Sequence, residues 1–219
     1  MKNIFCIVGA SGAGKSYYYS SLTLDTKFMK KAKAEPLVYG TTRPPREGEK
    51  DGIDYNFVSL EEYKNIDKNK FLEFRSYNRM DGVVYYFTLE DYITKGDKNL
   101  ICTSSLFQYE SYRNWINLEN LRNPNSYGLY LIILDANIKN RLCRTVNNRC
   151  KSNNDIYEAC RRVVEERAEL DTVRARVPEL MDPMSYNTVL FIDTNDISKE
   201  SNFNNLNKIK NFILSKTSK

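Results

Sequence analysis

The stretch that decides the fold reads Gly9-Ala10-Ser11-Gly12-Ala13-Gly14-Lys15-Ser16 and directly follows an apolar run at residues 4–8. A buried strand that feeds a tight glycine turn and then a helix points backbone N–H groups and the positive helix end at one place. The pattern G-x-x-x-x-G-K-[ST] therefore predicts a loop that binds a polyphosphate. Lys15 is expected to reach the β- and γ-phosphates, and the Ser16 hydroxyl to hold Mg²⁺. The alternative is a glycine turn that only joins a strand to a helix.

Strand-like and helix-like segments alternate along the rest of the chain, the pattern of helices that cover a parallel sheet. We expect an α/β fold of the P-loop NTPase type, with a doubly wound parallel five-stranded sheet. The expected strands are residues 4–8, 37–39, 100–103, 129–134 and 189–192. The expected helices are residues 15–31, 107–120, 138–148, 155–170 and 203–214. In the last helix Phe203, Leu206, Ile209 and Ile213 recur at helical spacing and predict an amphipathic closing helix.

Composition narrows the class of protein. A chain of 219 residues with 41% hydrophobic residues can bury one substantial core. The formal charge of +5 is modest, so nucleic acid is not an expected partner. No apolar run approaches membrane-spanning length and no signal peptide follows Met1, so we expect a cytoplasmic protein. The absence of histidine excludes a histidine base, and the spacing of the five cysteines fits no common zinc pattern.

A second segment indicates which phosphate chemistry follows. It reads Thr41-Thr42-Arg43-Pro44-Pro45-Arg46-Glu47-Gly48-Glu49-Lys50-Asp51-Gly52-Ile53-Asp54-Tyr55-Asn56-Phe57-Val58. Arg43 and Arg46 lie three residues apart around a proline-stiffened turn, so their planar guanidinium groups could close on one phosphate dianion. Glu49 can orient an arginine, and the Tyr55 hydroxyl can donate to the same phosphate. An exposed charged loop is the alternative interpretation, and the position after the phosphate loop favours a second anion site.

This second segment resembles the nucleoside-monophosphate-binding signature of the guanylate kinase family, T-R-x-x-R-x-G-E-x-x-G-x-D-Y-x-F-V. The resemblance implies one guanylate kinase-like domain over residues 1–219. Its core is expected at about residues 1–36, 97–147 and 155–219. A monophosphate-binding lobe is expected at about residues 37–96, and a small lid at about residues 148–154. Because this region is polar and irregular in sequence, we expect no sheet layer of its own there.

Further residues of the lobe carry the resemblance. Phe71-Leu72-Glu73 looks like the family's F-[IL]-E, whose glutamate accepts hydrogen bonds from the guanine N1–H and amino group. Tyr86 and Thr88 resemble the tyrosine and hydroxyl residue of the Y-G-[ST] element, which touch the phosphate and the base. The resemblance therefore implies a monophosphate site made of Arg43, Arg46, Glu49, Tyr55, Glu73, Tyr86 and Thr88. A solvated glutamate at a helix end is the alternative interpretation of Glu73.

The chain departs from the family pattern at several places, and it looks like a divergent bacterial and phage-type branch. Matching Tyr86 and Thr88 requires an insertion of about four residues around residues 81–84. Tyr39 and Gly40 precede Thr41 where the family has a serine before the T-R motif. Cys102 and Ser104 occupy the positions of an aspartate pair, which leaves Ser16 and the phosphates to hold a largely hydrated Mg²⁺.

The lid is expected to supply basic side chains. Arg149 begins a polar run at residues 149–154, and Arg161 and Arg162 follow in a predicted helix. By their spacing these three arginines resemble the lid arginines that contact the transferred phosphoryl group in guanylate kinases. The alternative for Arg161 and Arg162 is pairing with Glu165 and Glu166 on a helix surface. The expected catalytic set is Lys15, Arg43, Arg149, Arg161 and Arg162.

The resemblance implies a transferase of purine nucleotide metabolism, an ATP-dependent nucleoside monophosphate kinase that makes GDP or dGDP from GMP or dGMP. Phosphoryl transfer depends on positioning and positive charge, which suits a chain without histidine. We expect Mg²⁺ with ATP, a monomer or homodimer, and no membrane partner. Three alternatives remain: a kinase for another nucleoside monophosphate, a non-catalytic guanylate kinase-like binding module, and a P-loop NTPase or polynucleotide 5′-kinase.

Overall fold

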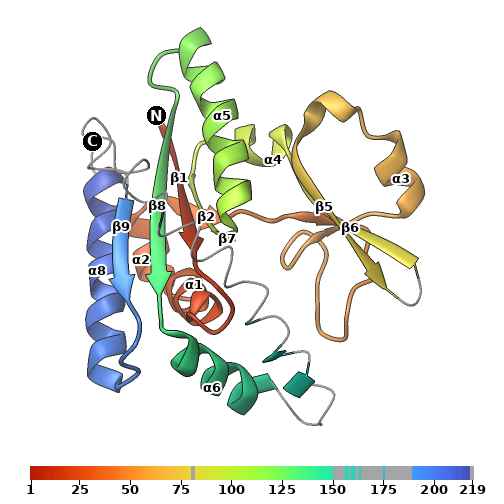
Figure 1. Cartoon of the computed structure of the whole chain (residues 1–219). Coiled ribbons are helices and arrows are strands. Elements are labelled where there is room, and N and C mark those ends of the chain that lie inside the picture. Colours follow the sequence, from red (N-terminus) through yellow and green to blue (C-terminus); the bar gives the residue numbers. More distant parts are fainter. Residues whose placement is uncertain are drawn as a thin grey trace.

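A five-stranded parallel sheet forms the centre of the computed structural model, with strand order β2-β7-β1-β8-β9 (Figure 1). The model describes residues 1–79, 82–149, 156–157, 159–160, 163, 175 and 189–217. The strands are β1 (Lys2–Val8), β2 (Ala34–Pro36), β7 (Asn99–Ser104), β8 (Tyr127–Asp135) and β9 (Val189–Asp193). All seven residues of β1 are buried, as expected for a central parallel strand that is covered on both faces.

Two hydrophobic clusters cover the two faces of this sheet. Phe5 and Ile7 of β1 pack with side chains of α1 (Lys15–Thr23), α2 (Thr26–Lys31) and α8 (Lys199–Thr217). The alternate residues of β1, such as Ile4 and Cys6, pack with α4 (Glu90–Thr94) and α5 (Leu106–Arg122). Because successive side chains of a strand point to opposite faces, one apolar run in β1 serves both clusters.

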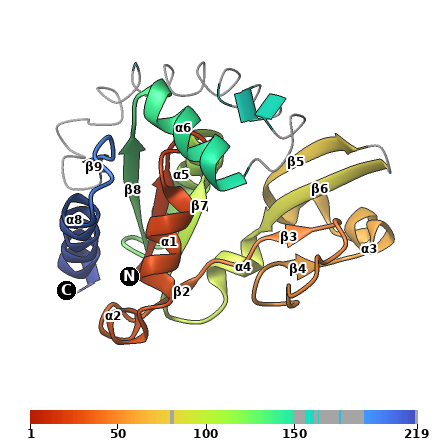
Figure 2. The ribbon, with the colours of Figure 1, turned by 90° about the horizontal axis from the view of Figure 1, so that it is seen from below.

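A separate four-stranded sheet forms the monophosphate lobe, with order β4-β3-β6-β5. Its strands are β3 (Gly40–Thr41), β4 (Asn56–Phe57), β5 (Phe71–Arg79) and β6 (Gly82–Leu89). The short elements α3 (Leu60–Asn65) and η1 (Lys68–Lys70) precede β5. In Figures 1 and 2 this lobe projects to one side of the central sheet. The expectation that this region forms no sheet layer was wrong, because β5 and β6 pair over almost their whole length.

Three other expectations about elements need correction. The edge strand lies at Ala34–Pro36 rather than at residues 37–39, because after Leu37 the chain turns to bond the lobe through Val38 and Tyr39. The expected helix at residues 15–31 is two helices, since the Asp25 side chain accepts from the Phe28 N–H and starts α2. In α8, Phe203 is 63% exposed, so Ile209 and Ile213 rather than Phe203 anchor the closing helix.

The remaining long helix, α6 (Ile138–Arg149), lies beside the phosphate loop at the carboxyl end of the sheet (Figure 2). The expected helix at residues 155–170 and the expected lid at residues 148–154 lie largely outside the described residues. Among the helices that the model describes, none has the length and apolar character needed to cross a membrane.

Candidate functional site

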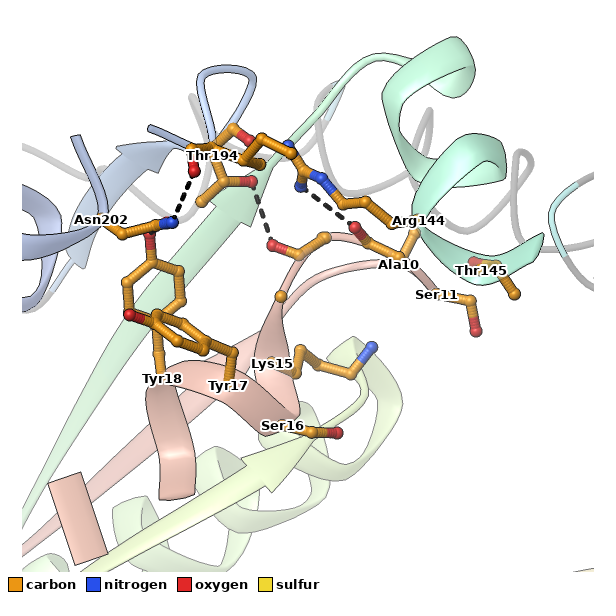
Figure 3. A pocket seen from close by; sticks show the side chains of 14 residues that line it. Ala10, Ser11, Lys15, Ser16, Tyr17, Tyr18, Arg144, Thr145, Thr194 and Asn202 are labelled. Atoms are coloured by element: carbon orange, nitrogen blue, oxygen red, sulfur yellow. Dashed lines mark hydrogen bonds between the residues drawn. The ribbon is translucent and has the colours of Figure 1, made fainter. Parts of the chain in front are cut away.

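A cavity of about 480 Å³ opens above the loop between β1 and α1 (Figure 3). Its lining comes from three segments that are far apart in the sequence: the loop with the start of α1, the middle of α6, and the turn from β9 into α8. The lining residues are Ala10, Ser11, Gly12, Ala13, Gly14, Lys15, Ser16, Tyr17, Tyr18, Arg144, Thr145, Thr194, Ile197 and Asn202. The structure therefore places nearly the whole predicted phosphate loop on one cavity wall.

The loop conformation requires glycine at two of its positions. Gly12 has a φ of 79° and Gly14 a φ of 98°, both in the region that side chains with a Cβ rarely adopt. A Cβ on Gly12 would also overlap the carbonyl oxygen of Arg141, because α6 packs directly against the loop. The spacing of glycines in the motif thus reflects both backbone strain and close approach to α6.

Side chains behind the loop fix the directions of its peptide groups. Arg141 Nε donates to the Ser11 carbonyl at 2.9 Å, and Thr194 Oγ1 donates to the Ala13 carbonyl at 3.0 Å. In a trans peptide the carbonyl and the following N–H point in opposite directions. The N–H groups of Gly12 and Gly14 therefore point away from these donors, where an anion can accept from them.

Arg144 also supports the loop, through a hydrogen bond from Nη1 to the Gly12 carbonyl at 3.1 Å. Its other amino group donates to the Thr194 carbonyl, so Arg144 joins the loop to the turn after β9 (Figure 3). Arg141, Arg144 and Thr194 were not among the site residues expected from the sequence. Their roles depend on tertiary contacts, because the local sequence does not indicate which carbonyl group a helix arginine will contact.

Lys15 and Ser16 lie at the start of α1, on the cavity wall (Figure 3). The Lys15 ammonium group donates to the carbonyl oxygen of Gly9 across the loop. Ser16 is exposed and can offer its hydroxyl to a metal ion bound with phosphates. Within the described residues no group of three or more acidic, histidine or cysteine side chains could hold a metal ion.

In the lobe, Arg43 is held from several directions. Its guanidinium makes two hydrogen bonds to the Glu49 carboxylate, both at 2.9 Å. Arg43 Nε donates to the Tyr86 hydroxyl at 3.1 Å, and Nη1 donates to the Pro44 carbonyl at 2.8 Å. The Arg43 side chain is 3% exposed, and the paired Arg43 guanidinium lowers the pKa of Glu49. Arg43 therefore organises the turn, and most of its N–H groups already have protein partners.

The other expected phosphate ligands surround Arg43 and keep polar atoms for a ligand. The Tyr86 hydroxyl accepts from Arg43, so its own O–H hydrogen can be donated elsewhere. The ring of Tyr55 lies 5.3 Å from the Arg43 guanidinium carbon and 5.8 Å from the Tyr86 ring. Arg46 is exposed, and its backbone N–H donates to Glu49 at 2.7 Å. Arg43 is thus a buried arginine that organises the turn, whereas Arg46 is an exposed arginine that can contact a phosphate.

Glu73 lies at the base of the lobe, paired across the hairpin with Thr88. Glu73 Oε1 accepts from Thr88 Oγ1 at 2.8 Å and from Gln108 Nε2 at 2.9 Å. Glu73 Oε2 is buried and has no hydrogen-bond partner among the described residues. Burial raises the pKa of Glu73, although the hydrogen bonds from Gln108 and Thr88 oppose the rise. A buried carboxylate oxygen without a partner is expected where a ligand supplies the donor.

Three positions depart from the family pattern, namely Tyr39, Cys102 and Ser104. The Tyr39 hydroxyl donates to the Thr103 carbonyl at 2.7 Å. Cys102 is fully buried in the core, with its sulfur 3.6 Å from that of Cys6, so it offers nothing to a metal in the cavity. Ser104 is 5% exposed. Gln108, which contacts Glu73 directly, was not among the site residues expected from the sequence.

The sequence also predicts three catalytic arginines in and after the lid. Arg161, Arg162 and most of the expected lid lie outside the described residues, and so does the side chain of Arg149 at the end of α6. Their catalytic assignment therefore stays a prediction from the sequence.

Comparison with known proteins connects this site to a family. The family model described as guanylate kinase matches residues 1–100, which contain the phosphate loop and the lobe. The guanylate kinase of Helicobacter pylori (strain ATCC 700392 / 26695) is 49% identical over 74 residues, 32% of each chain. That of Neisseria gonorrhoeae (strain ATCC 700825 / FA 1090) is 44% identical over 73 residues, 33% of each chain. The matched region thus spans about a third of the length of these curated relatives.

A solved structure extends the similarity of fold over the whole chain. The crystal structure of guanylate kinase from Anaplasma phagocytophilum aligns with a TM-score of 0.53 and 16% sequence identity. The alignment covers 100% of this chain and 87% of that one. At this identity the likeness concerns the fold, whereas the matched residues 1–100 carry the two sequence signatures. Residues 1–100 are thus similar in sequence to guanylate kinases, and the whole chain is similar in fold to one of them.

Proposed function

We propose that this protein is an ATP-dependent nucleoside monophosphate kinase that converts GMP or dGMP to GDP or dGDP. The observation that carries the proposal is the buried, unpartnered Glu73 Oε2 in the same small sheet as the Arg43–Glu49–Tyr86 cluster. This arrangement offers an acceptor for a base and donors for a phosphate on one lobe. The cavity over the phosphate loop supplies a second, independent anion site.

In the proposed reaction, an oxygen of the GMP phosphate attacks the γ-phosphorus of ATP, and the bond to the β-phosphate oxygen breaks to release ADP. The N–H groups of Gly12 and Gly14 and the Lys15 ammonium group would hold the phosphates of ATP. Arg46, Tyr55 and Tyr86 would hold the phosphate of GMP. No side-chain nucleophile is needed, because positioning and positive charge provide the catalysis.

The far end of the cavity offers a place for the nucleoside of ATP. Tyr17, Ile197 and Asn202 line it together with Arg144. The Tyr18 hydroxyl donates to Asn202 Oδ1 at 3.0 Å, which fixes this wall. An aromatic ring, an aliphatic side chain and a planar guanidinium suit the faces of a base.

A magnesium ion bound together with ATP would supply positive charge for the negative charge that develops during transfer. The Ser16 hydroxyl fits this role, and Mg²⁺ commonly keeps several water ligands. As part of the proposal, a lid at residues 148–154 carries Arg149, the segment that follows it carries Arg161 and Arg162, and the lobe at residues 37–96 closes over GMP. We also propose a cytoplasmic enzyme, as a monomer or homodimer, without nucleic acid or membrane partners.

The test is a coupled assay of ADP release with ATP, Mg²⁺ and each of the eight common ribo- and deoxyribonucleoside monophosphates. We expect GMP or dGMP to give the highest kcat/KM. Turnover of another monophosphate in preference to these would reassign the substrate. Binding of GMP by calorimetry without turnover of any monophosphate would instead identify a non-catalytic binding module.

A further inference from the structure

We propose that Gln108 is a specificity-determining residue that donates a hydrogen bond to the O6 atom of the base while it holds Glu73. The proposal deepens the proposed function and rests on it. Gln108 lies on α5, in the central domain, whereas Glu73 lies on β5 of the lobe. The hydrogen bond of 2.9 Å between them joins the two parts at the base-binding position.

The orientation of the Gln108 amide is fixed at both ends. Its Oε1 accepts from the backbone N–H of Ser105 at 3.0 Å, as the third residue of a capping box at the start of α5. Its Nε2 donates to Glu73 Oε1. A flipped amide would place an oxygen against the carboxylate and an amino group against the Ser105 N–H, so both contacts would be lost.

Two hydroxyl groups near Glu73, those of Thr88 and Tyr112, are already used. Tyr112 is fully buried, and burial raises its pKa, so its O–H stays protonated. The Tyr112 hydroxyl lies 2.8 Å from Thr88 Oγ1, and Thr88 Oγ1 donates to Glu73. With a single hydrogen on each hydroxyl, Tyr112 donates to Thr88 and Thr88 to Glu73. Neither of these two hydroxyl groups can also donate to a base, and the Tyr39 hydroxyl donates to the Thr103 carbonyl.

Unlike these hydroxyl groups, the Gln108 amide nitrogen has a second hydrogen that can be donated to a ligand. An amide nitrogen carries two hydrogens, and Gln108 Nε2 makes one hydrogen bond within the described part of the chain. The site therefore presents a free acceptor, Glu73 Oε2, beside a free donor, the second N–H of Gln108. A 6-oxopurine presents the complementary pair, N1–H beside O6. Adenine presents the reverse pair and would leave both protein groups unsatisfied.

The experiment compares GMP with 6-thio-GMP, which keeps N1–H and the amino group but has a weakly accepting sulfur in place of O6. The variant is Gln108→Glu, which retains the capping box and has nearly the same size but lacks the N–H donor. In the unmodified enzyme we expect GMP to have the higher kcat/KM. In the variant we expect the ratio of kcat/KM for GMP to 6-thio-GMP to fall by about 2- to 10-fold, the value of one hydrogen bond.

Glu62→Gln is the matched control, because Glu62 holds the same position in the capping box of α3 and lies on the lobe surface. It should leave the ratio unchanged. Gln108→Met, with no carboxylate to repel Glu73, should lower the ratio in the same way and covers the case in which Gln108→Glu does not fold.

The outcomes separate the two proposals. If the unmodified enzyme turns over no GMP, the proposed function fails, and this inference fails with it. If GMP is a good substrate but folded Gln108 variants lose kcat/KM equally for both nucleotides, Gln108 only supports the fold and the inference is wrong. A lower ratio in the variants with an unchanged ratio in Glu62→Gln supports the inference.

Discussion

The phosphate loop and the lobe are each proposed to bind a phosphate group, but they are built from different parts of the chain. The loop presents backbone N–H groups, and its conformation depends on glycines and on arginines of α6 that hold its carbonyl groups. The lobe presents side chains, and the buried Arg43–Glu49 pair holds the turn that carries them. In the loop, therefore, a few glycine positions define the site, whereas in the lobe several side chains must keep their exact partners.

The two sites also differ in the secondary structure that holds them in place. The loop follows a fully buried central strand, and α6 closes it from behind. The lobe has two strands of two residues each, β3 and β4, and one long hairpin. Local opening is expected where few apolar contacts are buried, so the lobe is the part suited to moving during a catalytic cycle.

The largest effect is expected from Lys15→Ala, which removes the one charged side chain of the phosphate loop. We expect kcat to fall by about 10²- to 10⁵-fold, since lost charge stabilisation at a transferred phosphoryl group has effects of this order. The melting temperature should change little, because Lys15 is not part of the hydrophobic core. Unchanged turnover would mean that the loop does not bind the reacting phosphates.

A pair of glycine variants tests whether the loop is the more constrained of the two sites. Gly12 and Gly48 have similar positive φ values, 79° and 84°, but a Cβ on Gly48 would meet no atom within 4 Å. Positive φ alone costs about 1–2 kcal/mol for alanine, so Gly48→Ala should lower the free energy of unfolding by that amount. Gly12→Ala should cost more, because its Cβ also overlaps the Arg141 carbonyl.

Ligand binding provides the second measurement for this pair. Calorimetric titration should show a loss of ATP affinity in Gly12→Ala and no such loss in Gly48→Ala. Equal losses in the free energy of unfolding for the two variants would show that α6 shifts easily to make room, and that packing against α6 does not constrain the loop.

Arg46→Ala tests the exposed arginine of the lobe. Loss of a charged hydrogen bond to the monophosphate should raise KM for GMP by about 10-fold or more, while ATP affinity of the free enzyme stays the same. The control is Arg122→Ala on α5, whose side chain is 71% exposed and pairs with Glu119. A fall in ATP affinity instead would assign the Arg43–Arg46 turn to the other nucleotide.

The smallest effect concerns pH and Glu73. Its pKa lies above the ordinary value of 4.5 because the carboxyl group is buried, and the protonated form gives up an acceptor for N1–H. GMP affinity should therefore fall as pH drops through the raised pKa. At that pH half of the carboxyl groups are protonated, so the affinity should be about twofold weaker than at higher pH.

Glu73→Gln is the reference for this titration, because it keeps the size of the side chain and removes its ionisation. The difference between the pH profiles of the unmodified enzyme and the variant separates the titration of Glu73 from that of the GMP phosphate. Parallel profiles would show that Glu73 does not contact the base.

Sequence patterns were sufficient for the local features of the molecule. The order of strands and helices in the core followed from apolar runs and their spacing, and the loop at residues 9–16 followed from a motif that encodes its own geometry. The turn at residues 41–58 was identified for the same reason, since its arginines, glycines and Glu49 are neighbours along the chain. Short-range chemistry can be inferred from sequence because the chain itself holds such groups together.

Contacts between distant segments were decided by tertiary structure. The alternating residues of β5 and β6 could have suggested strands, but their pairing places Glu73 beside Thr88, and only the packing of α5 brings Gln108 to Glu73. Arg141, Arg144 and Thr194 support the phosphate loop from more than a hundred residues away, as the separations of 130, 132 and 181 positions show. The sequence predicted two anion sites. The packing of helices and sheets determined which donors remain free in each, because a hydrogen already used by one partner is not available to a ligand.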